Sequence, residues 1–130
     1  MKLLLDTHCW LWTMHDPIKL NKKVRTLIEN PEVTVFLSAA SIWEIAIKVK
    51  LGKLKLPSDV EQYVFRRMKE EQFTELPISS RHAARVGALP EHHRDPFDRI
   101  LVAQAQCEEL ALVTADRQLA AYEVKIIQAN

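Results

Sequence analysis

The stretch Lys2-Leu-Leu-Leu-Asp6 places three consecutive leucines directly before a carboxylate. A short continuous apolar run of this kind is typical of a strand buried on both faces of a parallel sheet. Residues 33–37 form a second run, rich in β-branched and aromatic side chains, and shorter runs occupy residues 73–76, 110–113 and 124–127. These runs predict several short strands, with Asp6 at the end of the first.

Helical patterns separate the apolar runs. Ser38 stands where an N-cap belongs, before a long apolar segment that is closed by Gly52, and Asp95-Pro96 opens another helix. The expected helices span residues 7–14, 21–29, 39–51, 59–71, 79 or 80–88 and 96–109, and a further helix starts at residue 117. Alternating strands and helices predict an α/β fold, a three-layer α/β/α sandwich on a mainly parallel sheet. The 130 residues fit a single domain spanning 1–130.

Composition excludes several classes of protein. No apolar run approaches the ~20 residues of a membrane helix, and Asp6 and His8 interrupt the first run too early for a signal peptide. We therefore expect a cytoplasmic protein without a membrane partner. Two glycines, Gly52 and Gly87, cannot form a glycine-rich phosphate loop. The two cysteines lie too far apart for a Cys-x-x-Cys metal site and fit a reducing compartment.

The formal net charge is +1, so any nucleic acid must bind a local basic patch. Residues 48–55 contain four lysines and no acid, and we consider Lys48, Lys50 and Lys53 candidate contacts to an RNA backbone. The alternative is a solvated helix end whose lysines complement the helix dipole.

Acidic residues stand at two expected strand ends. Asp6 follows the first strand, and Asp116 follows the run at residues 110–114 by two positions. Ligands bind at the carboxyl ends of strands in open parallel sheets, which makes both residues candidates for a site. Each has an alternative role as the N-cap of the next helix.

Glu44 lies in an apolar segment whose few polar residues, Ser41, Glu44 and Lys48, share one narrow stripe. We expect the rest of this helix to be largely buried, so that the stripe opens onto a polar or metal-filled cleft. The alternative is an i,i+4 ion pair between Glu44 and Lys48.

The segment at residues 93–100 is rich in ionisable side chains. Asp95 fits an N-cap and Asp98 the third helical position, where a first-turn acid is common. Apolar neighbours commit this helix to burial against the sheet, so that Asp98 points toward the strand ends. Converging carboxylates repel one another unless a cation neutralises them, and all-oxygen ligands suit Mg²⁺ or Mn²⁺. With no histidine or cysteine evidently involved, zinc is less expected, and phosphoryl hydrolysis is the chemistry such a site commonly performs.

Five segments in this order resemble PIN-domain proteins of the VapC toxin type, the ribonuclease half of bacterial type II toxin–antitoxin pairs. They are Leu-Leu-Asp-Thr-His (residues 4–8), Ser-x-x-Ser-x-Trp-Glu-Ile (38–45), residues 48–56, His-Arg-Asp-Pro-Phe-Asp-Arg-Ile (93–100) continuing to residue 105, and Leu-Val-Thr-Ala-Asp (112–116). The resemblance covers essentially the whole chain. It implies an Mg²⁺- or Mn²⁺-dependent endoribonuclease, a homodimer, and inhibition by a small cognate antitoxin.

The resemblance also assigns roles to residues. It implies that the catalytic, metal-binding acids are Asp6, Glu44, Asp98 and Asp116. It implies supporting roles for Thr7, Ser41, Asp95 and Thr114. Two other readings remain open: another metal-dependent phosphohydrolase, which lacks its Asp-x-Asp motif here, and a non-enzymatic binding module whose tryptophans contact a partner.

Overall fold

The computed structural model describes all 130 residues and is built on one five-stranded sheet. The strands lie in the order β3-β2-β1-β4-β5, and every neighbouring pair is parallel. Their bounds are β1 Lys2–Leu5, β2 Thr34–Ser38, β3 Thr74–Leu76, β4 Ala111–Thr114 and β5 Ile126–Gln128. The mainly parallel sheet expected from the sequence is therefore confirmed.

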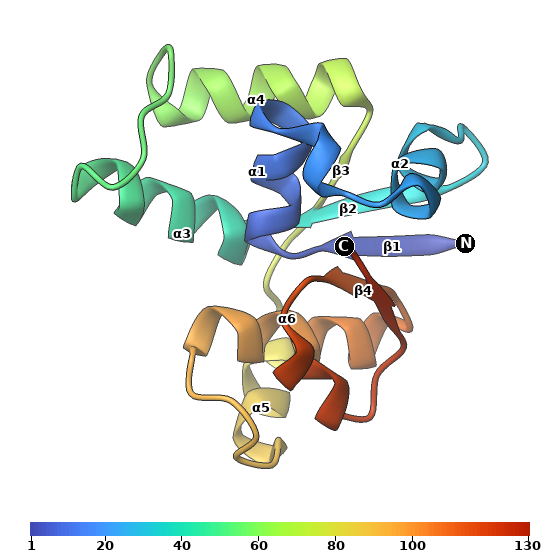
Figure 1. Cartoon of the computed structure of the whole chain (residues 1–130). Helices are drawn as coiled ribbons and strands as arrows, with labels where there is room; N and C mark the ends of the chain where they lie inside the picture. The colour runs from blue at the N-terminus through green and yellow to red at the C-terminus, as the bar shows by residue number, and fades with distance from the viewer.

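Helices cover both faces of the sheet (Figure 1). One face carries α1 Thr7–His15, α2 Lys22–Glu29, α3 Ala39–Lys50 and α4 Val60–Glu71, and the other carries α5 Ser80–Ala88 and α6 Pro96–Glu108. Two short 3-10 turns, Pro17–Lys19 and Arg117–Ala121, complete the chain. This arrangement confirms the three-layer α/β/α sandwich. None of the helices is both long and apolar enough to cross a membrane.

The three leucines of β1 explain why its sequence is a continuous apolar run. Leu3 and Leu5 pack into the core beneath α1 to α4, and Leu4 packs into the core beneath α5 and α6. All three side chains are fully buried, because successive residues of a strand point to opposite faces and both faces are covered.

Helix starts follow the capping residues in the sequence. Asp6, Asn21, Ser38, Asp59, Ser79 and Asp95 each accept a backbone N–H from the first turn of the helix that follows. Of the two serines considered for α5, Ser79 is the cap. The helix expected from residue 117 is only the 3-10 turn, and Asp116 caps it.

Helix α3 differs from the expectation that its apolar faces are buried. Only Ala40, Ser41 and Ile45 are buried, whereas Trp43 and Leu51, at its end, are 61% and 62% exposed. The helix packs on the core through one side, and no layer covers its outer side. The expectation was wrong because a helix that is apolar nearly all round can also present an uncovered face for a partner.

Candidate metal and nuclease site

The site forms where β1 and β4 end side by side. Leu5 pairs with Val113 in the sheet, and the backbone N–H of Asp6 donates to the carbonyl of Val113 at 3.0 Å. This is the carboxyl edge of two central strands, the position at which parallel sheets bind ligands. The side chains that follow these strands therefore start from one place in the fold.

Asp6 is buried and has both carboxylate oxygens engaged. Its Oδ1 accepts the backbone N–H of Cys9 at 2.8 Å, which caps α1, and its Oδ2 accepts the hydroxyl of Thr114 at 2.5 Å. The capping role and the role of a strand-end acid thus coincide in one residue.

Thr114 connects the two strand-end acids. Its buried hydroxyl donates to Asp6 and accepts the backbone N–H of Asp116 at 3.0 Å. The hydroxyl therefore fixes where the chain turns toward Asp116. On the other side of Asp6, the Thr7 hydroxyl donates to Ser41 at 2.9 Å and joins the first turns of α1 and α3.

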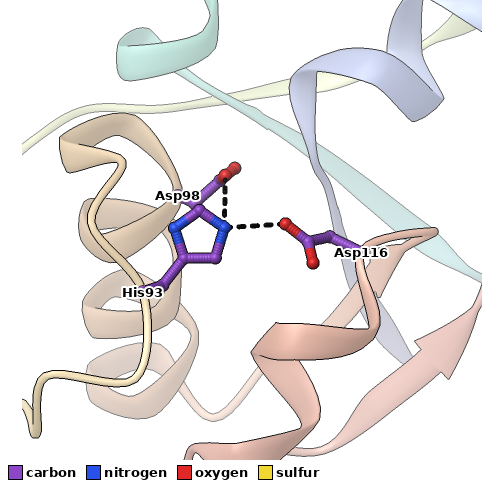
Figure 2. A group of neighbouring side chains, drawn as sticks. All are labelled: His93, Asp98 and Asp116. Carbon is purple, nitrogen blue, oxygen red and sulfur yellow. Dashed lines mark hydrogen bonds and ion pairs between the residues drawn. The ribbon is translucent and has the colours of Figure 1, made fainter.

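Asp98 and Asp116 approach each other around the imidazole of His93 (Figure 2). One potential ligand atom from each of the three residues lies within 4.8 Å of the other two. His93 Nε2 is 2.7 Å from Oδ2 of Asp116 and 3.4 Å from Oδ2 of Asp98. No histidine was expected at the site from the sequence, so His93 is an addition to the predicted set.

The backbone turn before α6 explains how His93 reaches the acids. The backbone N–H of Asp95 donates to His93 Nδ1 at 3.0 Å, which holds the ring against the helix start. The carboxylate of Asp95 meanwhile caps α6 by accepting the backbone N–H groups of Phe97 and Asp98. The only signal in the sequence is the His-x-Asp-Pro spacing, since residues 90–95 belong to no periodic element.

The electrostatics of Asp98 indicate that several negative charges converge on it. Burial is the largest cause that raises the pKa of Asp98 to about 7, followed by the charge of Asp95. The charges of Asp6 and Glu44 raise this pKa further. Crowded carboxylates of this kind match the oxygen donor set of a hard divalent cation, so the residues present fit Mg²⁺ or Mn²⁺.

Asp6 and Glu44 lie outside the tight group of His93, Asp98 and Asp116. Glu44 is largely buried, and its carboxylate lies 3.5 Å from Lys48 Nζ on the next turn of α3. The ion pair considered from the sequence therefore forms, and it coexists with the effect of Glu44 on Asp98.

A surface hollow lies between α3 and the start of α6, and Glu44 and Asp95 are the acids that line it. It is lined on one side by Glu44, Lys48 and Lys53 and on the other by Arg94 and Asp95. Lys50 does not line it. Arg94 is a further cation of the lining, outside the lysines predicted from the sequence.

Cys9 lies beside Asp6, and its thiol is a poor candidate for chemistry. Burial raises the pKa of this thiol far above its ordinary value, and the neighbouring charge of Asp6 raises it further. The thiol stays protonated, so it supplies neither a thiolate nucleophile nor a metal ligand.

Comparison with known protein families identifies the class of protein to which this fold and site belong. A family model described as PIN domain matches residues 3–125, and the chain belongs to the PIN domain family. The chain is similar to Ribonuclease VapC16 of Mycobacterium tuberculosis (strain ATCC 25618 / H37Rv), with 37% identity over 62 residues. That match covers 48% of this chain and 44% of the relative, less than half of either protein.

Solved structures share the fold along nearly the whole chain. VapBC2 from Rickettsia felis bound to a promoter DNA fragment has a TM-score of 0.75 at 15% identity and covers 100% of both chains. DNA-bound VapBC from Salmonella typhimurium has a TM-score of 0.69 at 15% identity and covers 98% of this chain and 97% of that one. FitAcB from Neisseria gonorrhoeae has a TM-score of 0.66 at 20% identity, with coverage of 97% and 96%. At these identities the likeness shows the fold alone.

Proposed function

We propose that this protein is an Mg²⁺- or Mn²⁺-dependent endoribonuclease and the toxin of a type II toxin–antitoxin pair. The observation that carries the proposal is the surroundings of Asp98, where burial and the charges of Asp95, Asp6 and Glu44 raise its pKa to about 7. A divalent cation relieves such crowding and favours the ionised carboxylates. Membership of the PIN domain family and similarity to Ribonuclease VapC16 support phosphodiester hydrolysis.

Each residue near the site has a distinct part in this proposal. Asp6, Asp98 and Asp116 hold the metal, and Glu44 completes the acidic set. When bound, the metal supplies an activated water and stabilises charge on the phosphodiester oxygens. Thr114 orients Asp6 through its hydroxyl, and Asp95 caps the helix that presents Asp98. The hydroxyl of Thr7 donates to Ser41 and joins α1, which Asp6 caps, to α3, which carries Glu44.

The basic residues that line the hollow form the proposed binding surface for the RNA backbone. Lys48 and Lys53 line it together with Arg94, next to Glu44 and Asp95. Phosphate contacts of this kind position a nucleic acid without reading its sequence. Lys50 lies outside the hollow and is therefore the weakest of the three candidate lysines.

A cognate antitoxin and a second copy of the chain are the proposed protein partners. The solved structures of similar fold include VapBC and FitAcB complexes, which supports an antitoxin partner. Trp43 and Leu51 offer exposed apolar surface on α3, and Trp43 packs edge-on against Phe97 at 5.1 Å between ring centroids. An RNA substrate and two buried free thiols agree with action in the cytoplasm.

The exposed face of α3 also favours a second candidate, a non-enzymatic binding module. The two candidates differ in their metal chemistry. A fluorescent RNA incubated with the antitoxin-free protein should be cut in Mg²⁺ or Mn²⁺ and stay intact in excess EDTA. Asp98→Asn should abolish cleavage, whereas Glu32→Gln, a matched removal of one exposed carboxylate, should not. Full cleavage in EDTA would overturn the metal mechanism, and no cleavage under any condition would favour the binding module.

A further inference from the structure

Building on the proposed metal site, we propose that His93 positions Asp116 by donating a hydrogen bond from Nε2 and does not itself bind the metal. Three contacts carry this inference: the imidazole contact at Nδ1, the imidazole contact at Nε2, and a backbone contact to the other oxygen of Asp116.

The contact at Nδ1 decides where the ring proton is. The backbone N–H of Asp95 points at Nδ1 of His93 with a nitrogen–nitrogen distance of 3.0 Å. A peptide N–H can only donate, so Nδ1 must be the acceptor and carries no proton. With Nδ1 an acceptor, the ring N–H of His93 is at Nε2.

The contact at Nε2 then becomes a donated hydrogen bond. Nε2–H points to Oδ2 of Asp116 at 2.7 Å, and Oδ2 of Asp98 is 3.4 Å away (Figure 2). A metal bound at Nε2 would require this proton to move to Nδ1, where it would face the N–H of Asp95. The Nδ1–H of His93 and the backbone N–H of Asp95 would then be two donors facing each other. Nε2 therefore acts as a hydrogen-bond donor, although it lies close enough to the acids to share a metal with them.

The second contact to Asp116 shows what the donated bond accomplishes. Its Oδ1 accepts the backbone N–H of Gln118 at 2.9 Å, and its Oδ2 accepts His93. One donor on each oxygen fixes the rotation of the carboxylate, while each oxygen keeps a lone pair for a cation. Without His93, only the bond to Gln118 would hold this partly exposed side chain.

The loop that carries His93 is itself held rigidly. The guanidinium of Arg99 donates to the carbonyls of Val86, Leu89, Pro90 and His93 at 3.0–3.5 Å. These bonds tie residues 86–93, which include an irregular segment, to the first turn of α6. The imidazole is therefore placed before any metal arrives, as expected for a group that orients a ligand.

The first test is a measurement on the metal-free wild-type protein. Long-range ¹H–¹⁵N correlations report which nitrogen of each histidine ring is protonated, and His93→Gln identifies the His93 signals by their loss. We expect a proton on Nε2 and none on Nδ1. A proton on Nδ1 would overturn the proposal, and this readout does not depend on metal binding or on activity.

The second test compares Mn²⁺ affinity among variants, using the electron paramagnetic resonance signal of free Mn²⁺. His93→Gln places an amide N–H near the position of Nε2 and should keep the dissociation constant within about threefold of wild type. His93→Asn is too short to reach Asp116 and should weaken binding about tenfold or more, the usual size of such an outer-sphere loss. The spin-echo modulation of bound Mn²⁺ in the wild type should show no directly bound imidazole nitrogen.

A double-mutant cycle separates positioning from ligation. In an Asp116→Ala background, His93→Asn should change the Mn²⁺ dissociation constant by less than about twofold, because its route of action is already removed. A full tenfold loss in that background, or a bound imidazole nitrogen, would overturn the proposal. Failure of the wild type to bind Mn²⁺ would instead overturn the proposed function, and the position of the ring proton would still test His93 as a donor.

Discussion

The hydroxyl of Thr114 donates to the carboxylate of Asp6 across 2.5 Å, although the two residues are 108 positions apart in the chain. Both side chains are buried, and the same hydroxyl oxygen accepts the backbone N–H of Asp116. One oxygen atom thus links the ends of β1 and β4.

Thr114→Val tests this link, because valine has nearly the same shape and no hydroxyl. The change removes a donor from a buried carboxylate, and we expect a loss of about 2 kcal/mol in the free energy of unfolding at pH 7. Thr114→Ser keeps the hydroxyl and should lose less than half as much. Urea unfolding in EDTA measures both. Equal losses for the two variants would mean that the methyl packing, and not the hydrogen bond, stabilises the site.

The raised pKa of Asp98 predicts a pH dependence of stability. In the metal-free folded protein Asp98 keeps its proton up to about pH 7, whereas in the unfolded chain it releases the proton near 3.8. Between these values the folded state binds more protons, so the free energy of unfolding falls as pH rises. The full contribution is present below pH 3.8 and is lost above 7.

Asp98→Asn removes this titration while nearly preserving shape. In EDTA the variant should exceed wild type in free energy of unfolding by more at pH 8.5 than at pH 5, and the gap should widen by about 2–3 kcal/mol between the two pH values. Urea midpoints at the two pH values measure the difference, with Glu32→Gln as the control. A variant that is less stable than wild type at both pH values would mean that Asp98 is only a favourable first-turn acid of α6.

Asp6, Asp98 and Asp116 could be predicted as site residues from the sequence, because simple rules of sheet and helix geometry give their positions. A parallel sheet brings residues that follow its central strands to one edge, and an apolar helix turns its first residues toward that edge. The order of strands need not be known, since β1 and β4 are both continuous apolar runs and therefore central. In the structure Asp98 and Asp116 meet around His93, and Asp6, which lies outside that group, raises the pKa of Asp98 through its charge.

The role of His93 and the exposure of the outer side of α3 could not be predicted from the sequence. The position of His93 depends on Arg99 and on the backbone N–H of Asp95, contacts made by an irregular loop without periodicity. The exposure of Trp43 depends on which layers exist around α3, and the pattern of apolar residues is the same for a core and for a partner surface. Both features are set by tertiary context.

The lysines beside the site predict a salt dependence of RNA binding. Lys53 lines the hollow next to Glu44, and Lys50 does not, although the two differ little in sequence context. Lys53→Gln should weaken binding of a short RNA in EDTA and reduce the slope of log affinity against log salt by about 1, whereas Lys50→Gln should change it less. Fluorescence anisotropy at several salt concentrations measures the slopes. Identical slopes for both variants and wild type would mean that these lysines do not contact RNA and only form the solvated end of a helix.

Metal binding should stabilise the folded protein in a way that depends on the proton of Asp98. At a hundredfold excess over its dissociation constant, a metal that binds only the folded state adds about 2.7 kcal/mol to the free energy of unfolding. Asp98 must be ionised to accept the cation, and its pKa in the metal-free protein is about 7. At pH 6 only about a tenth of the molecules have an ionised Asp98, so the apparent affinity should fall about tenfold relative to pH 8, equivalent to ~1.4 kcal/mol.

Melting curves with and without Mn²⁺ at pH 6 and pH 8 measure this increment. Wild type and Glu32→Gln should lose roughly half of the Mn²⁺ increment on going from pH 8 to pH 6 at a fixed metal concentration. Asp98→Asn should show a smaller increment that changes less over the same interval, because its side chain has no proton to release. An increment in Asp98→Asn equal to that of wild type at both pH values would place the metal elsewhere, since the acid with the raised pKa would then take no part in binding it.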